Sequence, residues 1–311
     1  MHTALLALLL AIAQTDQPAS QAAEQAKKEA ASSNNLPGPT AEVVFSGQHS
    51  FASGFSDAEG EVSVTRAGVD ASFTMATSQR GRLTLGLSAE RSAYNFHDAT
   101  GFVGGSSEPW DDVMTGGLSL RFSRQHDQQW SYFAGVDVAS SAQDNAGISD
   151  SITYGGVVGV LFAQSERVRY GLALGVHTRL EDDATFLPLP LVAWQIDDQW
   201  SLASAPRRGG GQVGLNYAWC ETLTLGVAVG FESRDFRLSD GAPVGGGVGR
   251  DSRIPVCFTA SYKPHPQVSV SAEVGANFSQ QFTLDDADGG RVSQLDADIG
   301  FFAGVGVTLT F

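Results

Sequence analysis

The feature that most constrains the fold of this chain is the spacing of its apolar residues, which recur at every second position over most of the sequence. Within 223–232, large apolar side chains alternate with small or polar ones, and the same alternation covers 168–177 and 268–278. Successive side chains of a β-strand point to opposite faces of the sheet. The pattern therefore predicts strands with one apolar face and one small or polar face. After the N-terminus no apolar run reaches about eighteen residues, which argues against a helical membrane protein.

The links between the predicted strands alternate in length. Short links lie near 77–81, 125–129, 164–167, 197–199, 221–222 and 263–266. Longer polar links lie between most of them, near 96–111, 141–151, 235–252 and 284–297. A soluble β-sandwich also has alternating strands. Short turns that alternate with long loops are typical of a transmembrane β-barrel with periplasmic turns and external loops.

Aromatic residues gather beside the short links, and therefore at one end of the predicted strands. Amphipathic rings at a membrane–water boundary form such a girdle, and chance packing at the strand ends is the alternative. The expected girdle consists of Trp130, Tyr170, Trp194, Trp200, Trp219 and Tyr262. The segments Asp127–Ser131 and Asp198–Ser201 resemble each other, which indicates one type of turn used twice.

The pattern predicts fourteen strands, near 41–52, 62–76, 82–94, 113–124, 130–140, 152–163, 168–180, 186–196, 200–206, 212–220, 223–234, 254–262, 267–279 and 300–311. An even number places both termini on the same side of the membrane. Twelve is the alternative, because Pro188, Pro190 and Pro206 weaken the ladder over 186–206. The sheet must close, since lipid cannot satisfy the hydrogen bonds of an open edge. The expected fold is therefore all-β, an antiparallel up-and-down transmembrane barrel.

The C-terminus carries a more specific pattern. Phe311, Leu309 and Val307 share one strand face with further apolar residues, while Thr310, Thr308 and Gly306 occupy the other face. A terminal aromatic residue preceded by alternating apolar residues resembles the assembly signal of bacterial outer-membrane β-barrels. The likeness covers 41–311 as a pattern, and the motif covers about the last ten residues. It implies recognition by the barrel-assembly machinery and a porin-like barrel of a family without assigned function.

The first forty residues differ from the rest of the chain. Residues 1–13 hold a short apolar run, and Ala11 and Ala13 form a small-residue cleavage site, which predicts a signal peptide, although the positive charge usual before such a run is missing. Residues 14–40 lack an apolar face and are expected to be a disordered periplasmic segment, with a plug inside the barrel as the alternative. The barrel is expected to begin at residue 41.

The two cysteines are expected to be unpaired. Cys220 and Cys257 fall on strands that are separated by a third strand, so they lie about 9–10 Å apart. A disulfide requires Cα atoms closer than about 7 Å.

Charged and polar residues on the non-apolar face are predicted to point into the barrel, since a charge that faces lipid costs about 2–4 kcal/mol near the midplane. These candidates are Asp70, Glu90, Arg121, Asp137, Arg169, His177, Arg179, Glu181, Asn216, Glu232 and Glu273. Most other inward positions carry small side chains, which leave room for water. Either a water-filled pore or a lumen filled by ion pairs fits this composition. His177, Arg179 and Glu181 form either a constriction on one strand or a set of solvated charges.

No strong catalytic motif is present, so neither catalytic residues, a cofactor nor a metal is expected. A hydrolase whose site is dispersed over several strands stays open as an alternative. The acidic loop 285–290 lacks the ligand spacing of an EF-hand.

The sequence thus favours a passive channel for small hydrophilic solutes in the outer membrane of a Gram-negative cell. A structural or surface-interaction barrel with a filled lumen is the main alternative. A transporter of hydrophobic solutes would need an apolar patch in the lumen, which the alternation does not indicate. Expected partners are outer-membrane lipids, lipopolysaccharide and the assembly machinery. The formal net charge of −15 argues against a nucleic-acid partner, and the oligomeric state is left open.

Overall fold

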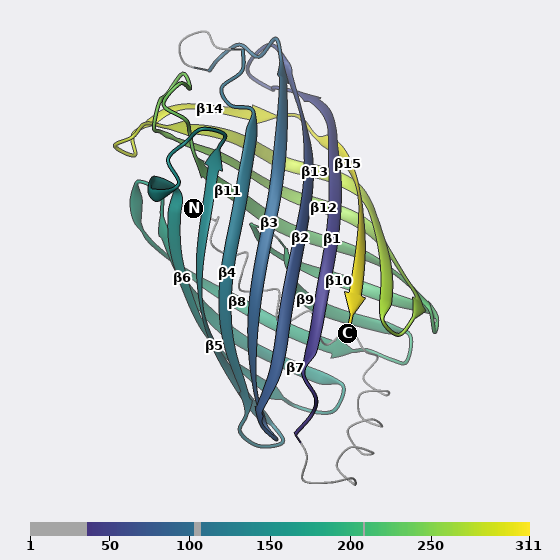
Figure 1. Cartoon of the computed structure of the whole chain (residues 1–311). Helices are drawn as coiled ribbons and strands as arrows, with labels where there is room; N and C mark the ends of the chain where they lie inside the picture. Colours follow the sequence, from purple (N-terminus) through teal and green to yellow (C-terminus); the bar gives the residue numbers. More distant parts are fainter. Residues whose placement is uncertain (1–35, 103–106, 208) are drawn as a thin grey trace.

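The computed structural model describes residues 36–102, 107–207 and 209–311. It contains fifteen β-strands, and fourteen of them form one closed antiparallel barrel (Figure 1). The barrel strands are β1 (Thr40–Gly54), β2 (Glu61–Ser78), β3 (Gly81–His97), β4 (Asp112–Gln125), β5 (Trp130–Gln143), β6 (Ile152–Ala163), β7 (Val168–Arg179), β8 (Asp182–Gln195), β9 (Trp200–Arg207), β10 (Gly210–Cys220), β11 (Leu223–Arg237), β12 (Val248–His265), β13 (Val268–Asp285) and β15 (Gly300–Thr310). The predicted fold class and strand number are confirmed. The predicted signal peptide and most of the predicted disordered segment lie outside the described residues.

The barrel closes between its first and last strands. β1 pairs with β15 in the register Val43↔Leu309, and β13 joins β15 to β12. The remaining short strand, β14 (Arg291–Ala297), pairs with the outer end of β13 and belongs to no wall of the barrel. Over the described ranges no helix is long and apolar enough to cross a membrane.

The two ends of the barrel differ, as the link lengths predict. At the short-turn end, β2–β3, β4–β5, β6–β7, β8–β9, β10–β11 and β12–β13 are joined by short turns, and both β1 and β15 have their terminal ends here. In the repeated turn, the carboxylates of Asp127 and Asp197 accept hydrogen bonds from the backbone N–H groups two and three residues later, at 2.7–2.8 Å. The two turns are therefore the same type, and Asp197 rather than Asp198 is the counterpart of Asp127.

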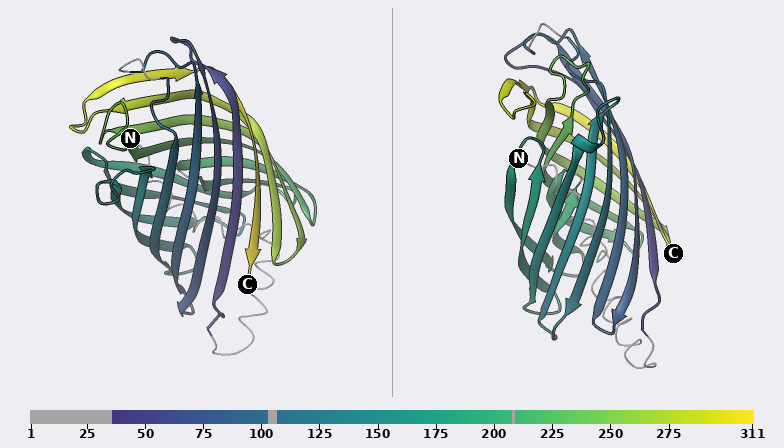
Figure 2. Two further views of the ribbon diagram at one scale, coloured as in Figure 1. Left: turned by 45° about the horizontal axis from the view of Figure 1, so that its top comes forward. Right: turned by 60° about the vertical axis from the view of Figure 1, so that its left-hand side comes forward.

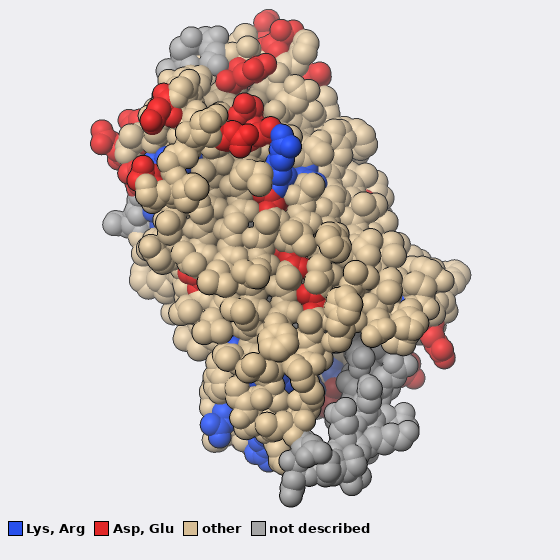
Figure 3. All heavy atoms as spheres, in the orientation of Figure 1, with Lys and Arg blue, Asp and Glu red and all other residues tan. Residues whose placement is uncertain are grey.

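The outer face is apolar, and large side chains on it are exposed, for example Leu87, Val158 and Phe258. Figure 3 shows one side of this surface, on which Asp and Glu gather at the long-loop end above a band with little charge. Cys220 and Cys257 are both free, as expected from their separation by β11.

The proline-containing region forms regular strands, but its ladder is short. Pro188 and Pro190 lie within β8 and keep register with β7. On the other side, β8 and β9 share only the pairs Ala193↔Ala203 to Gln195↔Ser201. Beyond these pairs, the hydroxyl of Ser204 replaces backbone hydrogen bonds between the two strands. It accepts from the N–H of Val192 and donates to the carbonyl oxygen of the same residue. Proline lacks an N–H, which explains why side-chain hydrogen bonds replace part of this ladder.

Two of the predicted long loops are shorter than expected. The loop predicted over 235–252 is confined to 238–247, and most of 284–297 is strand, because β11, β12 and β13 continue beyond the barrel wall and β14 adds a fourth strand to them. We call these outer ends the mouth sheet, which comprises residues 232–238, 248–253, 280–285 and 291–297. Figures 1 and 2 show these strands running across the upper, long-loop end of the barrel.

Candidate functional site in the barrel interior

The mouth sheet spans the interior of the barrel. Its strand β11 forms a parallel bridge with β5 through Arg237 and Ala142. In the order of the closed sheet, β11 and β5 are six strands apart one way and eight the other, so they stand on nearly opposite walls. The contact is possible because β6 stops pairing with β5 at Ser140, which leaves the end of β5 with a free edge. The mouth sheet therefore has one face toward β1–β4 and another toward β5–β8.

The face toward β1–β4 packs into an aromatic cluster. Its buried members are Phe55, Val62, Val64, Tyr94, Phe96, Ala99, Phe102, Trp110, Val113, Phe236, Leu238, Phe282, Leu284, Leu295 and Ala297. Ring centroids of Tyr94 and Phe236 are 5.9 Å apart, as are those of Phe96 and Phe282, and the second pair meets at 74°. Edge-to-face contacts of this kind add to the gain from burial. The cluster closes this side of the interior.

This cluster contradicts the expectation that the lumen has no apolar patch. On β3 the same alternation continues from Leu83 to His97, but the apolar residues change faces. Leu85 and Leu87 are exposed on the outside, whereas farther along Tyr94 and Phe96 are buried inside. The apolar residues change faces at the point where the outer face of β3 no longer has apolar surroundings and its inner face packs against other parts of the protein. The sequence also shows this change, because the large apolar residues of the strand move from odd-numbered to even-numbered positions.

A β-bulge on β13 produces the same result by a different route. Phe278 and Phe282 are four residues apart and would share a face in a regular strand. Between them Ser279 has a φ of 49°, and the register with β12 gains one residue. Phe278 is therefore exposed on the outside, while Phe282 is fully buried inside. Such a bulge re-aims every later side chain of its strand.

Below the aromatic cluster lies a layer of ion pairs that joins opposite walls. Glu232 is 1% exposed and is held by Arg207, Arg234 and Arg253. Arg234 also donates to Glu90 at 3.1 Å. Further contacts complete the layer: Arg207 to Glu273, Arg253 to Gln48 and Ser50, and Arg66 to Asp251. The predicted inward residues Glu90, Glu232 and Glu273 thus belong to one network, in which arginines from β9, β11 and β12 satisfy the buried carboxylates.

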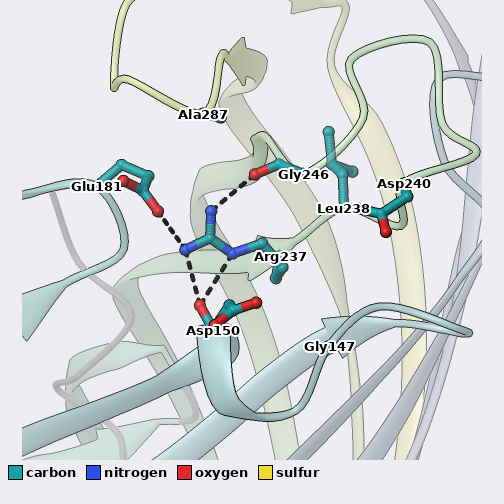
Figure 4. Close-up of a pocket in the computed structure, with 8 residues that line it drawn as sticks. All are labelled: Gly147, Asp150, Glu181, Arg237, Leu238, Asp240, Gly246 and Ala287. Atoms are coloured by element: carbon teal, nitrogen blue, oxygen red, sulfur yellow. Dashed lines mark hydrogen bonds and ion pairs between the residues drawn. The ribbon is translucent and has the colours of Figure 1, made fainter.

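The opposite face of the mouth sheet is polar. The guanidinium of Arg237 donates to the carbonyl oxygens of Asp150 at 2.7 and 2.9 Å and of Gly246 at 2.8 Å, and to the carboxylate of Glu181 at 2.5 Å (Figure 4). These groups line a pocket of about 320 Å³ at the rim, together with Gly147, Leu238, Asp240 and Ala287. One arginine therefore holds the tip of β11 to the loop after β5 and to the turn after β7.

The predicted cluster of His177, Arg179 and Glu181 does not lie on one strand. β7 ends at Arg179, and Glu181 occupies the following turn with a φ of 58°. Arg179 faces Asp235 of the mouth sheet at 3.8 Å. His177 turns instead toward Asp137 of β5. The three residues contact different partners and form no single constriction.

His177 and Asp137 flank Gly155 of β6, which stands between them in register. A side chain at Gly155 would collide with the imidazole and the carboxylate. Both side chains are 4% exposed, and their nearest atoms, Nδ1 and Oδ2, are 3.9 Å apart. That separation is longer than a hydrogen bond.

The remaining predicted inward residues line the interior at several levels. Asp70 is buried in β2, and Asn216 is half-buried in β10. Arg121 lies over the ring of Phe133 at 4.0 Å, next to an apolar wall formed by Val157, Ala173 and Leu191. Arg169 is exposed at the short-turn end. Many other inward residues in this half of the barrel are small and partly exposed, as shown by Ser123, Ser201, Ala203, Gly214, Thr224, Thr259, Ser261 and Thr308.

All six residues of the expected girdle are exposed at the short-turn end: Trp130, Tyr170, Trp194, Trp200, Trp219 and Tyr262. Neighbouring rings extend them, since Phe162 lies 4.8 Å from Trp130 and 5.6 Å from Tyr170. The C-terminal Phe311 is exposed on the outer face, and its backbone exchanges hydrogen bonds with Ala41 of β1. Leu309 and Val307 lie on the same face of β15.

Within the described part of the chain, no three His, Cys, Asp or Glu side chains come together as a metal site. In the acidic loop, Asp286 accepts hydrogen bonds from the backbone of Asp288 and Gly290, so its carboxylate shapes the turn.

No protein-family model matches the sequence, and no curated protein matches it. Among solved structures, an outer-membrane channel from Pseudomonas putida F1 is similar with a TM-score of 0.51 and 8% identity, over 90% of this chain and 97% of that one. A Pseudomonas aeruginosa FadL homologue has a TM-score of 0.47 and 12% identity, over 87% and 89%. The P. putida toluene transporter TodX has a TM-score of 0.44 and 9% identity, over 95% and 93%. The first likeness shows that the chain has the fold of an outer-membrane channel.

Proposed function

We propose that this protein is an outer-membrane channel that lets small hydrophilic solutes pass passively. In this proposal the short turns face the periplasm, and the mouth sheet faces the outside. The exposed aromatic residues at the short-turn end then lie at the inner membrane boundary, where amphipathic rings are favoured. The strand pattern of Val307, Leu309 and Phe311 serves assembly, and lipid covers the apolar outer face.

The observation that carries the proposal is the difference between the two halves of the interior. The half toward the short turns is lined by small polar side chains that remain partly exposed, which leaves room for water. On the side of β5–β8, the inner face carries the apolar residues Phe133, Val157 and Leu191 and, nearer the rim, the charged residues Arg179 and Arg237. In this proposal a hydrated solute passes the small polar side chains of the short-turn half and the charged groups at the rim. The opposite side is closed by the aromatic cluster.

The test is to insert the purified, refolded full chain into a planar lipid bilayer. We expect stepwise ion conductance, reduced by polymers small enough to enter the pore. Refolded protein can be verified by its altered gel migration before and after heating. A correctly folded barrel that gives no steps under any voltage would contradict the proposal.

A structural barrel is the second candidate, and the packed mouth is the observation that favours it. Seven aromatic residues and the ion-pair layer fill much of the long-loop half. This candidate expects a silent barrel that still folds and inserts. The conductance experiment therefore separates the two functions.

A further inference from the structure

The two faces of the mouth sheet are attached to the barrel by different chemistry. Toward β2 and β3 the attachment is the aromatic cluster, where Phe236 and Phe282 are fully buried. The buried ion pair of Arg66 with Asp251 strengthens this side, and Tyr94 donates to the same carboxylate at 3.2 Å. Separating this face would expose several buried rings to water, which is strongly unfavourable.

Toward β5–β8 the contacts of the described residues are polar, and they include the N–H of Ser239, which donates to the side-chain oxygen of Gln143 at 3.1 Å. Arg237 reaches Glu181 and the backbone of Asp150, Arg179 faces Asp235, and the backbone contact is a single bridge between Arg237 and Ala142. Glu181 is 31% exposed, so water can replace it as a partner of the guanidinium. The pair of Arg237 with Glu181 is therefore partly hydrated, and partly hydrated ion pairs stabilise a contact less than the burial of several aromatic rings does. Parting the sheet from this wall is therefore much less costly than parting it from β2 and β3.

The position of the polar side matters, because it borders the rim pocket at the outer end of the barrel interior. The rim pocket opens between the loop after β5, the turn after β7 and the mouth sheet (Figure 4). The Gly245–Gly247 segment joins β11 to β12 at this point, and Gly246 has a φ of 67°, which glycine adopts without strain. A small displacement of the β11 tip would enlarge the opening directly above Arg179 and His177.

We propose that the mouth sheet is the gate of the channel, anchored at β2 and β3 through the aromatic cluster and released at β5 and β7 when the contacts of Arg237 break. The inference rests on the proposed channel function. In this proposal the structure described here corresponds to the closed state. Opening leaves the fourteen-strand wall intact, since β14 and the outer ends of β11–β13 lie beyond the barrel ladder.

The first test removes the contacts that Arg237 makes with the opposite wall. Arg237→Ala removes three hydrogen bonds to the opposite wall, two to Asp150 and one to Glu181, together with one to Gly246 in the link after β11, and leaves the aromatic cluster unchanged. In planar bilayers we expect its open time to rise several-fold over that of the unmodified protein. The matched control is Arg291→Ala, which removes an exposed ion pair to Asp285 within the mouth sheet itself. That variant should conduct like the unmodified protein.

The second test locks the gate. Ala142 and Arg237 are direct neighbours in the bridge, and adjacent strands lie about 4.8 Å apart, within the range for a disulfide. The variant carries Ala142→Cys and Arg237→Cys, with Cys220→Ser and Cys257→Ser to remove the native thiols. Oxidation with copper phenanthroline should shut the channel. Dithiothreitol should open it beyond the level of the unmodified protein, because the arginine is also gone.

The outcomes separate the two proposals. Conductance that is the same in the oxidised and reduced states, and unchanged in Arg237→Ala, would overturn the gate but keep the channel. If no form conducts, including the reduced double-cysteine protein, the channel function fails and the gate fails with it. Gel migration with and without heating reports folding of each variant.

Discussion

The strands at the two ends of this barrel share the alternation of apolar with small or polar residues, but their surroundings differ. At the short-turn end, exposed aromatic residues such as Trp130 and Trp200 lie at strand ends, and many inward side chains are small. At the long-loop end, β2, β3, β11 and β13 continue, and their inner faces carry Tyr94, Phe96, Phe236 and Phe282. The apolar face of a strand thus turns outward where lipid surrounds it and inward where the protein packs on itself.

The comparison shows how one barrel can keep a lining with many small residues at one end and a folded core at the other. Lipid touches only the outer face of the barrel, so it gives no hydrophobic driving force for packing between the inward faces of opposite strands. Beyond the membrane, water surrounds the strands, and burial of aromatic side chains stabilises contacts across the interior. The long-loop end is therefore expected to depend on individual core residues, whereas the short-turn end depends on small turn contacts.

Phe282→Ala should have the largest effect. The side chain is fully buried and lies about 6 Å from the rings of Phe55, Phe96 and Trp110. Its loss leaves a cavity and should lower the free energy of unfolding by about 4 kcal/mol. Urea unfolding in lipid vesicles, followed by tryptophan fluorescence, measures this. Phe258→Ala, on the exposed outer face of β12, is the control and creates no cavity. Equal losses for the two variants would show that the mouth has no packed core.

Glu232→Gln should have a smaller effect of the same kind. Gln keeps the shape of Glu232 but removes the negative charge between Arg207, Arg234 and Arg253. Breaking a buried ion pair leaves uncompensated charge, and we expect a loss of about 3 kcal/mol. Glu221→Gln, exposed in the turn after β10, is the matched control. If both variants unfold at the same urea concentration, the ion-pair layer is solvated rather than buried.

Much of the fold could be predicted from the sequence because a two-residue period has one dominant cause. All fourteen strands were expected near their observed positions, since lipid on one face requires apolar residues such as Leu225 and Val227. The resemblance of Asp127–Ser131 to Asp198–Ser201 predicts one type of turn used twice, and the structure shows that Asp197, one residue before the second segment, is the equivalent of Asp127.

The candidate site could be predicted only in part. The alternation along each strand predicts that Glu90 and Glu232 point into the interior, but not that they are close together. In the structure Arg234 forms ion pairs with both carboxylates. The mouth sheet was missed because its strands contain charges that a lipid-facing strand would exclude, so 235–252 was interpreted as a loop. The bulge at Ser279 has no signal in the sequence, and without it Phe282 would be assigned to the outside. The contact of β11 with β5 is non-local and depends on how strands close across the barrel.

The smallest effect concerns the repeated turn at the other end. The backbone N–H groups of Trp130 and Gln129 donate to the carboxylate of Asp127, and this lowers its pKa. Those of Trp200 and Gln199 lower the pKa of Asp197 in the same way. A carboxyl group whose pKa is lower in the folded state stabilises the fold at pH values above its unfolded pKa. That contribution disappears as the pH falls through the folded value.

The double variant Asp127→Asn, Asp197→Asn should therefore lose less stability than the unmodified protein between about pH 5 and about pH 2, because its amides do not titrate. The measurement is the urea midpoint at several pH values in the same vesicles. Asp198→Asn is the control, since this neighbouring carboxylate pairs with Arg167 at 3.0 Å and does not bond the turn backbone. The control should keep the steeper pH dependence of the unmodified protein. If instead the double variant follows the same curve, the carboxylates at the short-turn end contribute nothing, and the stability of both ends would come from the long-loop core and the lipid-facing wall.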